Sequence, residues 1–331
     1  MSPGRRRLEE KIVRNLTSAR SLRELARLSE TSLSTVQYVL QRLTKRGEIR
    51  WIPRHSFFGL IKVGMVFDIE ETLPTLSEEA LPNGVAATYE LLGLGRRYLF
   101  VSGVFPRKLL DKALRKVEGI LNLKLGEKVL AREYIVRYPG IRTLRGDADE
   151  KQLKNLLERS RIPLRESEPP RVPDKIDLML LAGKETFGPF IRLNEIYRKL
   201  GKQAGLVNIS RQVLSYHYKH HVLPGWLYNT FIEYLPTSEI PLRLIILKGR
   251  DAPALARALM RIEHALEAYI DRYSALVIAQ YPCNLLRLVY ELISYASVSQ
   301  VDMTIMKPLI SRDVLRYWEF LGPKGKWILN D

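Results

Sequence analysis

Side chains suited to contacting nucleic acid recur along a predicted helix that begins near residue 34. Its polar face combines hydroxyl, amide and cationic groups, carried by Thr35, Tyr38, Gln41, Arg42 and Lys45. Hydroxyl and amide groups can hydrogen-bond to base edges, whereas cations contact phosphates. Because these positions lie on one side of a helix, the segment has the composition that a recognition helix requires.

Three helices and a strand are predicted to position these side chains. Apolar residues at helical spacing predict a first helix through residues 8–16. Ser21 and Glu24 form the pattern of a capping box and predict the start of a second helix. Ser34 and Gln37 offer the same pattern for a third helix, and residues 48–52 alternate like a strand. This order predicts a winged helix-turn-helix.

Basic residues flank the predicted motif. Residues 1–54 contain 13 Lys or Arg against 5 acids. We expect Arg5, Arg6 and Arg7 to form a flexible phosphate-binding arm, and Arg50 and Arg54 to serve a basic wing. A three-helix unit with a solvated polar face also occurs in protein-interaction modules, and that alternative stays open.

The composition of the whole chain points to a polyanionic partner. Its 53 basic and 36 acidic side chains give a net charge of +17. Cys283 is the only cysteine, which excludes an internal disulfide and a cysteine metal cluster within one chain. The sequence has neither the roughly 18 uncharged apolar residues of a membrane helix nor a secretory signal. We therefore expect a cytoplasmic protein that does not contact membranes.

Residues 25–36 and 43–49 resemble the leucine-responsive and asparagine-operon regulator (Lrp/AsnC) family. The resemblance rests on Leu25, Ala26, Thr35, Val36, Leu43, Gly47 and Ile49. It implies that the winged helix-turn-helix is followed by a ferredoxin-like domain of order β-α-β-β-α-β, which dimerises and often binds a small-molecule effector. No effector-binding residue can be transferred to this chain, so that site stays unassigned.

The pattern that follows fits the ferredoxin-like order. Strands are predicted at residues 62–70, 85–92, 97–105 and 128–138, with a helix through residues 109–117. A short, weakly marked helix at residues 74–81 would complete the order.

The second half of the chain repeats the first. Helical patterns at residues 176–181, 193–200 and 208–220 precede a predicted wing strand at residues 226–234. Strands at residues 242–247, 269–273, 275–281 and 298–306, with helices through residues 255–266 and 285–295, repeat the ferredoxin-like order.

We therefore predict an α+β fold in which two winged helix-turn-helix domains alternate with two ferredoxin-like (β-α-β-β-α-β) domains. The predicted segments are 1–57 and 174–236 (winged helix-turn-helix, the second divergent), 58–140 and 237–310 (ferredoxin-like), 141–173 (a charged, proline-rich linker or ordered strap) and 311–331 (a C-terminal tail). Two copies in one chain could pair internally, which would make the monomer a pseudo-dimer. Further homo-oligomerisation stays open.

The second predicted recognition helix is less typical and contains three histidines. His217 and His220 are three apart on one helical face, but no carboxylate or cysteine stands near them in the sequence. We therefore expect no metal site, and no other cofactor. The complete set of candidate DNA-contacting residues is Arg5, Arg6, Arg7, Ser34, Thr35, Tyr38, Gln41, Arg42, Lys45, Arg46, Arg50, Arg54, Arg211, Gln212, Ser215 and Lys219.

Three functions are compatible with these features. The first is a DNA-binding transcriptional regulator or chromatin-associated factor. The second is an RNA- or ribosome-binding factor that uses the same basic winged helix-turn-helix domains, with aromatic side chains such as Trp51 and Trp226 stacking on unpaired bases.

The third function is enzymatic. The predicted two-domain architecture resembles that of enzymes that decarboxylate sirohaem, and in some of these enzymes two copies are fused in one chain. Their sites use histidine and tyrosine with arginine, whereas the corresponding hairpins here, residues 88–98 and 268–273, contain no histidine. Since no dinucleotide loop, P-loop or Ser-His-Asp pattern emerges either, we expect no enzymatic activity.

Overall fold

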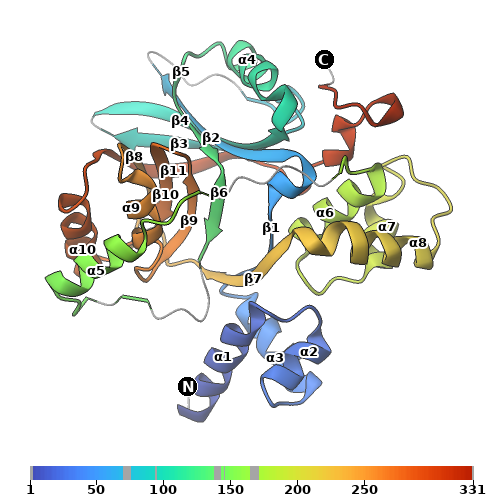
Figure 1. Cartoon of the computed structure of the whole chain (residues 1–331), viewed down its shortest axis with the longest axis horizontal. Helices are drawn as coiled ribbons and strands as arrows, with labels where there is room; N and C mark the ends of the chain where they lie inside the picture. Colours follow the sequence, from blue (N-terminus) through green and yellow to red (C-terminus); the bar gives the residue numbers. More distant parts are fainter. Residues whose placement is uncertain are drawn as a thin grey trace. The chain divides into compact units, whose positions relative to one another are not determined.

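The computed structural model describes residues 3–69, 76–93, 95–137, 143–144, 146–164 and 171–329 of the 331-residue chain. Its contacts divide the chain into two compact units, whose segments can be followed by colour in Figure 1. The helical unit comprises Met1–Arg54, Arg137–Arg142 and Pro173–Tyr234. The sheet unit comprises His55–Val136, Thr143–Val172 and Leu235–Asp331. None of the described helices is both long and apolar enough to cross a membrane.

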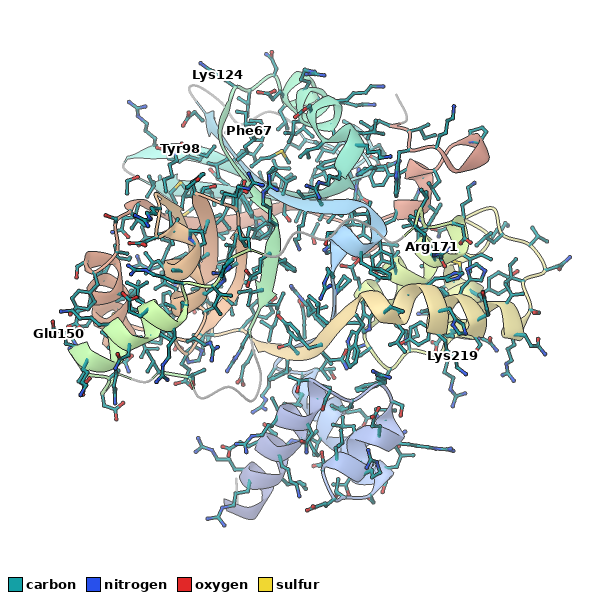
Figure 2. The ribbon with its side chains drawn as sticks, in the orientation of Figure 1. Phe67, Tyr98, Lys124, Glu150, Arg171 and Lys219 are labelled. Carbon is teal, nitrogen blue, oxygen red and sulfur yellow. The ribbon has the colours of Figure 1, made fainter. Side chains whose placement is uncertain are left out.

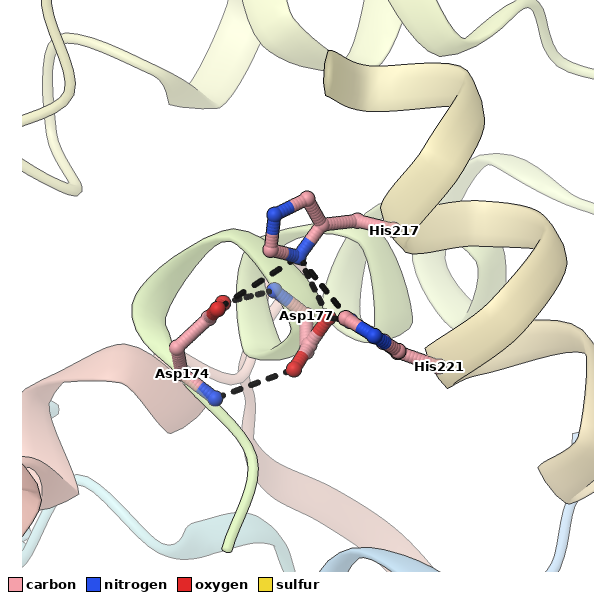
Figure 3. Close-up of side chains that lie close together, drawn as sticks. All are labelled: Asp174, Asp177, His217 and His221. Atoms are coloured by element: carbon pink, nitrogen blue, oxygen red, sulfur yellow. Dashed lines mark hydrogen bonds and ion pairs between the residues drawn. The ribbon is translucent and has the colours of Figure 1, made fainter.

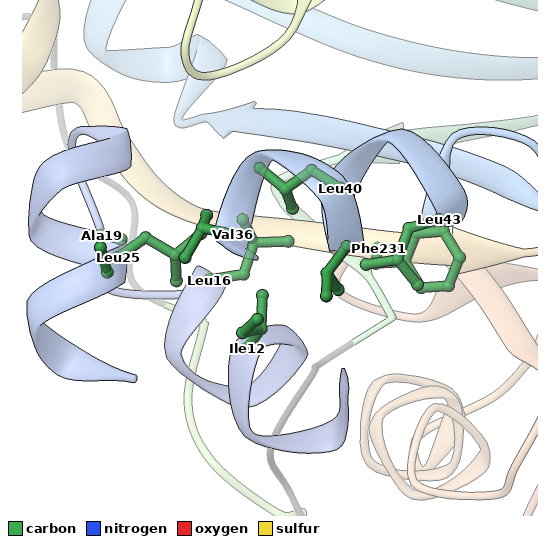
Figure 4. Packing of buried hydrophobic residues seen from close by; sticks show 10 residues of the cluster. Ile12, Leu16, Ala19, Leu25, Val36, Leu40, Leu43 and Phe231 are labelled. Atoms are coloured by element: carbon green, nitrogen blue, oxygen red, sulfur yellow. The ribbon is translucent and has the colours of Figure 1, made fainter. Parts of the chain in front are cut away.

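Three N-terminal helices pack around one apolar core. α1 (Pro3–Leu16), α2 (Leu22–Leu28) and α3 (Leu33–Leu43) follow the predicted order, and we call them the first head. Each carries apolar residues three and four apart, which places one buried stripe on each helix. The stripes meet in a cluster that includes Ile12, Leu16, Leu25, Val36 and Leu43 (Figure 4).

The helix starts differ in part from the predicted capping. Ser21 caps α2 as predicted, since its hydroxyl accepts a hydrogen bond from the Glu24 N–H at 3.1 Å. The capping box predicted for Ser34 and Gln37 was wrong, because α3 begins at Leu33 and is capped by Ser32. The Ser32 hydroxyl accepts a hydrogen bond from the Thr35 N–H at 3.1 Å, which leaves Ser34 exposed in the first turn.

A second set of helices lies in the same unit. α6 (Lys175–Phe187), α7 (Leu193–Leu200) and α8 (Arg211–His217) form the second head, and α7 has the predicted bounds. A π-helical segment, η3 (Tyr218–Val222), and a 3-10 turn, η4 (Leu223–Gly225), continue α8.

The strand that follows each head pairs with the strand of the other head. β1 (Gly47–Pro53) runs antiparallel to β7 (Trp226–Glu233) in a two-stranded ribbon (Figure 1). At Gly47 a Cβ atom would lie 1.9 Å from the Ile232 carbonyl oxygen, so this approach requires glycine. The two predicted wings therefore form a single ribbon that joins the heads.

β7 also completes the core of the first head. Phe231 belongs to the buried cluster of α1, α2 and α3 (Figure 4). Asn229 is buried beside it and donates hydrogen bonds to the carbonyl oxygens of Leu16 at 3.2 Å and Ala19 at 2.7 Å. The first head is thus closed by a strand that lies more than half the chain away in sequence.

Nine strands form one antiparallel sheet in the sheet unit. The first half supplies β2 (Leu60–Ile69), β3 (Val85–Gly93), β4 (Arg96–Pro106), β5 (Leu125–Ala131) and β6 (Glu133–Val136). The second half supplies β8 (Leu242–Lys248), β9 (Ala265–Ile270), β10 (Ser274–Ala279) and β11 (Ser299–Ser311). Their order is β5-β2-β4-β3-β11-β8-β10-β9-β6.

The strands at the ends of this order are consecutive in the chain, so the sheet is nearly closed. Only Arg132 separates β5, which pairs with β2, from β6, which pairs with β9. On the other side, β11 pairs with β8 through residues 299–305 and with β3 through residues 304–311. Both junctions join the two halves of the chain.

Helices complete each half of the sheet unit. α9 (Ala252–Leu259) and α10 (Cys283–Ser294) give the second half the predicted β-α-β-β-α-β order, and α4 (Leu110–Leu121) is the predicted second helix of the first half. The helix predicted at residues 74–81 is absent from residues 76–81, and residues 74 and 75 lie outside the described part. The helix predicted to reach residue 266 was too long, because apolar spacing alone does not separate a helix from the buried strand β9.

The segment predicted as a linker contains a helix. α5 (Glu150–Arg159) packs on α9 and α10 through its buried Leu153 and Leu157. Its N-cap Asp149 and Gln152 form a reciprocal capping box, which sequence inspection overlooked. The C-terminal segment also packs, since Tyr317, Trp318 and Phe320 of η5 (Tyr317–Phe320) are buried.

Candidate nucleic-acid interface and a histidine–aspartate cluster

The exposed face of α3 is arranged largely as the sequence predicted. Ser34, Tyr38 and Gln41 are exposed, and Tyr38 leaves 54% of its surface accessible. Lys45 is exposed in the turn after α3, because the helix ends at Leu43. Thr35 is half-buried, and its hydroxyl lies 2.8 Å from that of Ser32. The inward side chains of α3 are held in the core of the first head, so the helix presents its polar face outward.

Three of the predicted cations are engaged within the protein. Arg42 lies 3.4 Å from Glu9, and Arg46 forms an ion pair with the same carboxylate. Arg50 pairs with Glu48 at 2.6 Å and donates a hydrogen bond to the Tyr234 hydroxyl at 2.9 Å. Arg42 and Arg46 therefore link α3 and the turn after it to Glu9 of α1, and Lys45 is exposed in that turn.

The N-terminal arginines are helical, so the prediction of a flexible arm was wrong. α1 begins at Pro3, and Arg6 and Arg7 are exposed on its first turns. Arg6 pairs with Glu10 at 3.3 Å, a contact between neighbouring turns of a helix. The side chain of Arg5 lies outside the described part. Arg54 is exposed directly after β1, and its N–H donates a hydrogen bond to the Gly225 carbonyl oxygen at 2.7 Å.

The second head also presents polar side chains. Arg211, Gln212 and Lys219 are exposed, and Ser215 is half-buried. Figure 2 labels Lys219, which projects from the second head. The structure thus brings the four candidates of this head onto α8 and the start of η3.

The two units differ strongly in charge. The helical unit carries 23 Lys and Arg against 10 Asp and Glu, whereas the sheet unit carries 30 against 26. Most of the excess positive charge therefore resides in the unit that holds both heads. Long-range attraction of a polyanion depends on such concentration of charge.

Four metal-ligating side chains meet inside the second head. Asp174 and Asp177, at the start of α6, lie beside His217 and His221 of α8 and η3 (Figure 3). The donor atoms of the four residues all lie within 4.8 Å of one another. The sequence argument against a metal site assumed that no carboxylate lies near the histidines. That assumption was wrong, because two carboxylates some forty residues earlier in the chain complete the group.

The pairing of the histidines also differs from the predicted one. His221, one helical turn after His217, joins the cluster, whereas His220 is exposed and packs against Tyr216 with ring centroids 4.7 Å apart. The signal available in the sequence was the spacing of four residues between His217 and His221. Nothing in the sequence identified the aspartates as their neighbours.

A buried lysine lies elsewhere in the second head. Lys184 donates hydrogen bonds to the carbonyl oxygens of Pro189 at 2.8 Å and Ile191 at 3.0 Å. Burial lowers its pKa to about 8, because the charged form loses hydration. The pKa of the neighbouring Tyr218 is raised to about 12 by the same cause.

The sheet unit has a pocket of about 690 Å³ that the sequence did not indicate. Arg257 of α9 lines it with three loop arginines, Arg161, Arg250 and Arg272, together with Tyr273 and Asp251. Arg257 is buried and pairs with Glu133 at 2.6 Å, while Arg250 and Arg272 are exposed. Guanidinium groups at this density suit an anionic ligand.

A polar network joins the two halves of the sheet. Lys62 of β2 donates a hydrogen bond to the Tyr134 hydroxyl at 2.9 Å, and that hydroxyl in turn donates to Glu267 of β9. The hydroxyls of Ser102 and Tyr269 lie 2.9 Å apart in the same region. These side chains come from four strands far apart in sequence, so no local motif predicted them.

Comparison with known proteins identifies the fold alone. No protein-family model matches the sequence, and no curated protein matches it. The crystal structure of the siroheme decarboxylase NirDL matches 94% of this chain and 97% of its own, with a TM-score of 0.51 and 11% identity. NirDL in co-complex with an iron-uroporphyrin III analogue matches 95% of this chain and 96% of its own, with a TM-score of 0.50 and 11% identity. The chain therefore has an α+β fold that resembles NirDL over its whole length.

Proposed function

We propose that the helical unit binds double-stranded DNA, and that the protein acts as a transcriptional regulator or chromatin-associated factor. The observation that carries the proposal is the concentration of charge: 23 basic against 10 acidic side chains in the unit with both heads. Lys and Arg near phosphates release condensed counterions and so strengthen binding.

The exposed face of α3 supplies the means to discriminate between sequences. Gln41 has an amide that can contact adenine in a bidentate manner, and Lys45, exposed in the turn after α3, can contact a phosphate or a guanine. The α8 face, with Arg211 and Gln212, offers a second and different set of contacts. Since the β1–β7 ribbon joins the heads, a target with two unlike half-sites suits this intrachain pseudo-dimer.

Recovery of bound fragments from genomic DNA with the full chain tests the proposal. We expect Lys45→Ala to weaken binding of all sequences and to reduce the slope of log affinity against log salt by about 1. We expect Gln41→Ala to cost about 1–3 kcal/mol and to relax preference at one base pair. Lys124→Ala is the matched control, because Lys124 is exposed in the sheet unit (Figure 2).

Two outcomes would redirect the proposal. If Gln41→Ala and Lys45→Ala both bind duplex DNA like the wild type, α3 and the turn after it are not the interface. If a structured RNA binds more tightly than duplex DNA at the same salt concentration, the RNA-binding alternative replaces the DNA-binding one.

A second candidate function belongs to the sheet unit: binding of an anionic tetrapyrrole without catalysis. Two observations favour it, the full-length fold similarity to NirDL and the pocket lined by Arg250, Arg257 and Arg272. Guanidinium groups pair with the carboxylates that a uroporphyrin carries. Binding rather than catalysis is proposed because the described lining residues include no histidine.

Titration with iron-uroporphyrin, followed by absorbance, tests this candidate. A saturable spectral shift that is weakened by Arg250→Ala and Arg272→Ala is expected. Lys124→Ala should leave the shift unchanged. Absence of a shift in the wild type would remove the candidate without affecting the proposal for the helical unit.

A further inference from the structure

We infer that Asp174, Asp177, His217 and His221 form a binding site for one divalent transition-metal ion in the second head. The inference rests on the side-chain geometry of this cluster and does not depend on the proposed binding of DNA. Figure 3 shows the four side chains converging from two segments of the chain.

The donor atoms have the separations that ligands of one ion adopt. Asp177 Oδ1 lies 2.9 Å from His217 Nδ1 and 3.1 Å from His221 Nδ1, and the two nitrogens lie 3.2 Å apart. Asp174 Oδ2 lies 3.4 Å from His217 Nδ1. A tetrahedral ion with ligands at about 2.0–2.1 Å requires donor atoms about 3.3 Å apart. The four distances above lie close to that value, and the remaining separations, which reach up to 4.8 Å, would shorten by movement of the exposed Asp174 side chain.

The two histidine rings bring their Nδ1 atoms together. The ring centroids are 4.8 Å apart and the planes are inclined by 88°. Both Nδ1 atoms lie within 3.1 Å of Asp177 Oδ1, so each can occupy one ligand position of the same ion. The two histidines straddle the start of η3, and π-helical turns of this kind occur frequently at functional sites.

The capping box of α6 orients the two carboxylates toward the histidines. Asp174 Oδ1 accepts a hydrogen bond from the Asp177 N–H at 2.9 Å, and Asp177 Oδ2 accepts one from the Asp174 N–H at 3.0 Å. The reciprocal capping box of α6 therefore fixes one oxygen of each carboxylate and directs the other toward the histidines. Hydrogen bonds that orient ligands in this way are a regular feature of metal sites.

The donor set indicates the kind of ion. Two imidazole nitrogens with two carboxylate oxygens suit Zn²⁺ or Co²⁺ and disfavour Mg²⁺ and Ca²⁺, which prefer oxygen ligands alone. Asp177 is completely buried, whereas the Asp174 side chain is 49% exposed. The ion would therefore enter on the side of Asp174 and neutralise the buried carboxylate of Asp177.

Binding of the ion would fasten the start of α6 to the junction of α8 and η3. It would thereby hold the exposed face of α8, with Arg211 and Gln212, in a fixed orientation within the second head.

The experiment uses the full-length protein, stripped of metal with a chelator and titrated with Co²⁺ and Zn²⁺. We expect one equivalent of Co²⁺ with the intense visible absorption of a tetrahedral site, displacement by Zn²⁺, and a higher melting temperature with Zn²⁺. X-ray absorption of the Zn²⁺-loaded wild type should show two imidazole ligands and additional oxygen ligands.

Three variants locate the site. His221→Ala and Asp177→Asn should lose the bound equivalent and the rise in melting temperature. His220→Ala, which removes the adjacent histidine outside the cluster, should retain both. Asp177→Asn keeps a side chain that can cap α6, so its folding, checked by circular dichroism, serves as the reference if His221→Ala fails to fold.

The inference is overturned if the wild type binds no equivalent of either ion, or if His221→Ala and Asp177→Asn bind like the wild type. A count other than two imidazole ligands in the wild type overturns it as well, and that measurement needs no variant.

Discussion

At the scale of single residues, the buried amine of Lys184 makes stability depend on pH. Its pKa is lowered to about 8 in the folded protein, against an ordinary value of 10.5. Between these values the unfolded chain binds a proton that the folded chain lacks, so stability rises with pH. Below about pH 8 the amine is protonated in both states and gives no pH dependence.

Urea unfolding at pH 8, 9 and 10 measures this effect. We expect the wild type to gain up to about 1.4 kcal/mol per pH unit relative to Lys184→Met, which cannot titrate. The range stops at pH 10 because Tyr218, whose pKa is raised to about 12, acts in the opposite direction above its ordinary value of 10.0. If the unfolding free energies of the two proteins change in parallel with pH, Lys184 does not titrate in this range.

The residues of the candidate interface were predictable only where one helix decides their position. Helical spacing placed Tyr38, Gln41 and Lys45 on one face; the structure has Tyr38 and Gln41 exposed on α3, and Lys45 exposed in the turn after it. It gave no indication that Arg42 and Arg46 pair with Glu9, since that contact depends on how α1 packs against α3. The metal-ligand cluster was missed for the same reason, because its aspartates and histidines lie on different helices.

At the scale of elements, β7 belongs to the core of the first head. Truncation of Phe231 tests how much β7 contributes to the stability of that core. Phe231→Ala removes a ring that is 5% exposed within that core, and such truncations cost about 3–5 kcal/mol. We expect the backbone amides of α1, α2 and α3 to exchange hydrogen faster, by the factor that corresponds to this loss of unfolding free energy. Leu227→Ala on the same strand, where the side chain is 37% exposed, should change exchange little.

If Phe231→Ala accelerates exchange in the second head but not in the first, the assignment of β7 to the first core is wrong. The sequence predicted β1 as a strand from its alternating pattern and β7 from its aromatic and branched residues. It did not predict that they pair with each other, because alternation indicates which face of a strand is buried and carries no information on its partner.

At the scale of the whole molecule, close packing between the two halves of the sheet limits the size of interior side chains. A Cβ on Gly64 of β2 would meet Leu276 of β10 and Phe100 of β4, each at 3.1 Å. We expect Gly64→Val to destabilise the protein by about 1–3 kcal/mol through overpacking.

Gly119 supplies the control for this substitution. It lies on the exposed side of α4 with nothing within 4 Å of an added Cβ, so Gly119→Ala should stabilise the protein by up to about 1 kcal/mol. Urea unfolding of both variants checks the signs. A neutral Gly64→Val would mean that the interior of the sheet can expand at this point.

The order of strands and helices was largely predictable, whereas their closure into one sheet was not. Alternating and helical patterns predicted eight strands in the sheet unit and the helices α4, α9 and α10, with shifted ends. These elements were predictable because each depends on the residues of one short segment. The predicted strand at residues 128–138 is interrupted at Arg132 and divides into β5 and β6, which reach opposite ends of the strand order. That break arises from pairing with two different halves, which no local pattern encodes.

The ribbon of β1 and β7 has a consequence for synthesis of the protein. The helices of the first head leave the ribosome early, but Phe231 follows about 190 residues after α3 ends. At a synthesis rate of about 5–20 residues per second, β7 is made roughly 10 to 40 seconds after α3. Until then the apolar faces of α1, α2 and α3 lack the strand that covers them. During that interval chaperones can bind them, and the nascent chain has no complete first head. Any activity of that head therefore begins only when most of the polypeptide has been made.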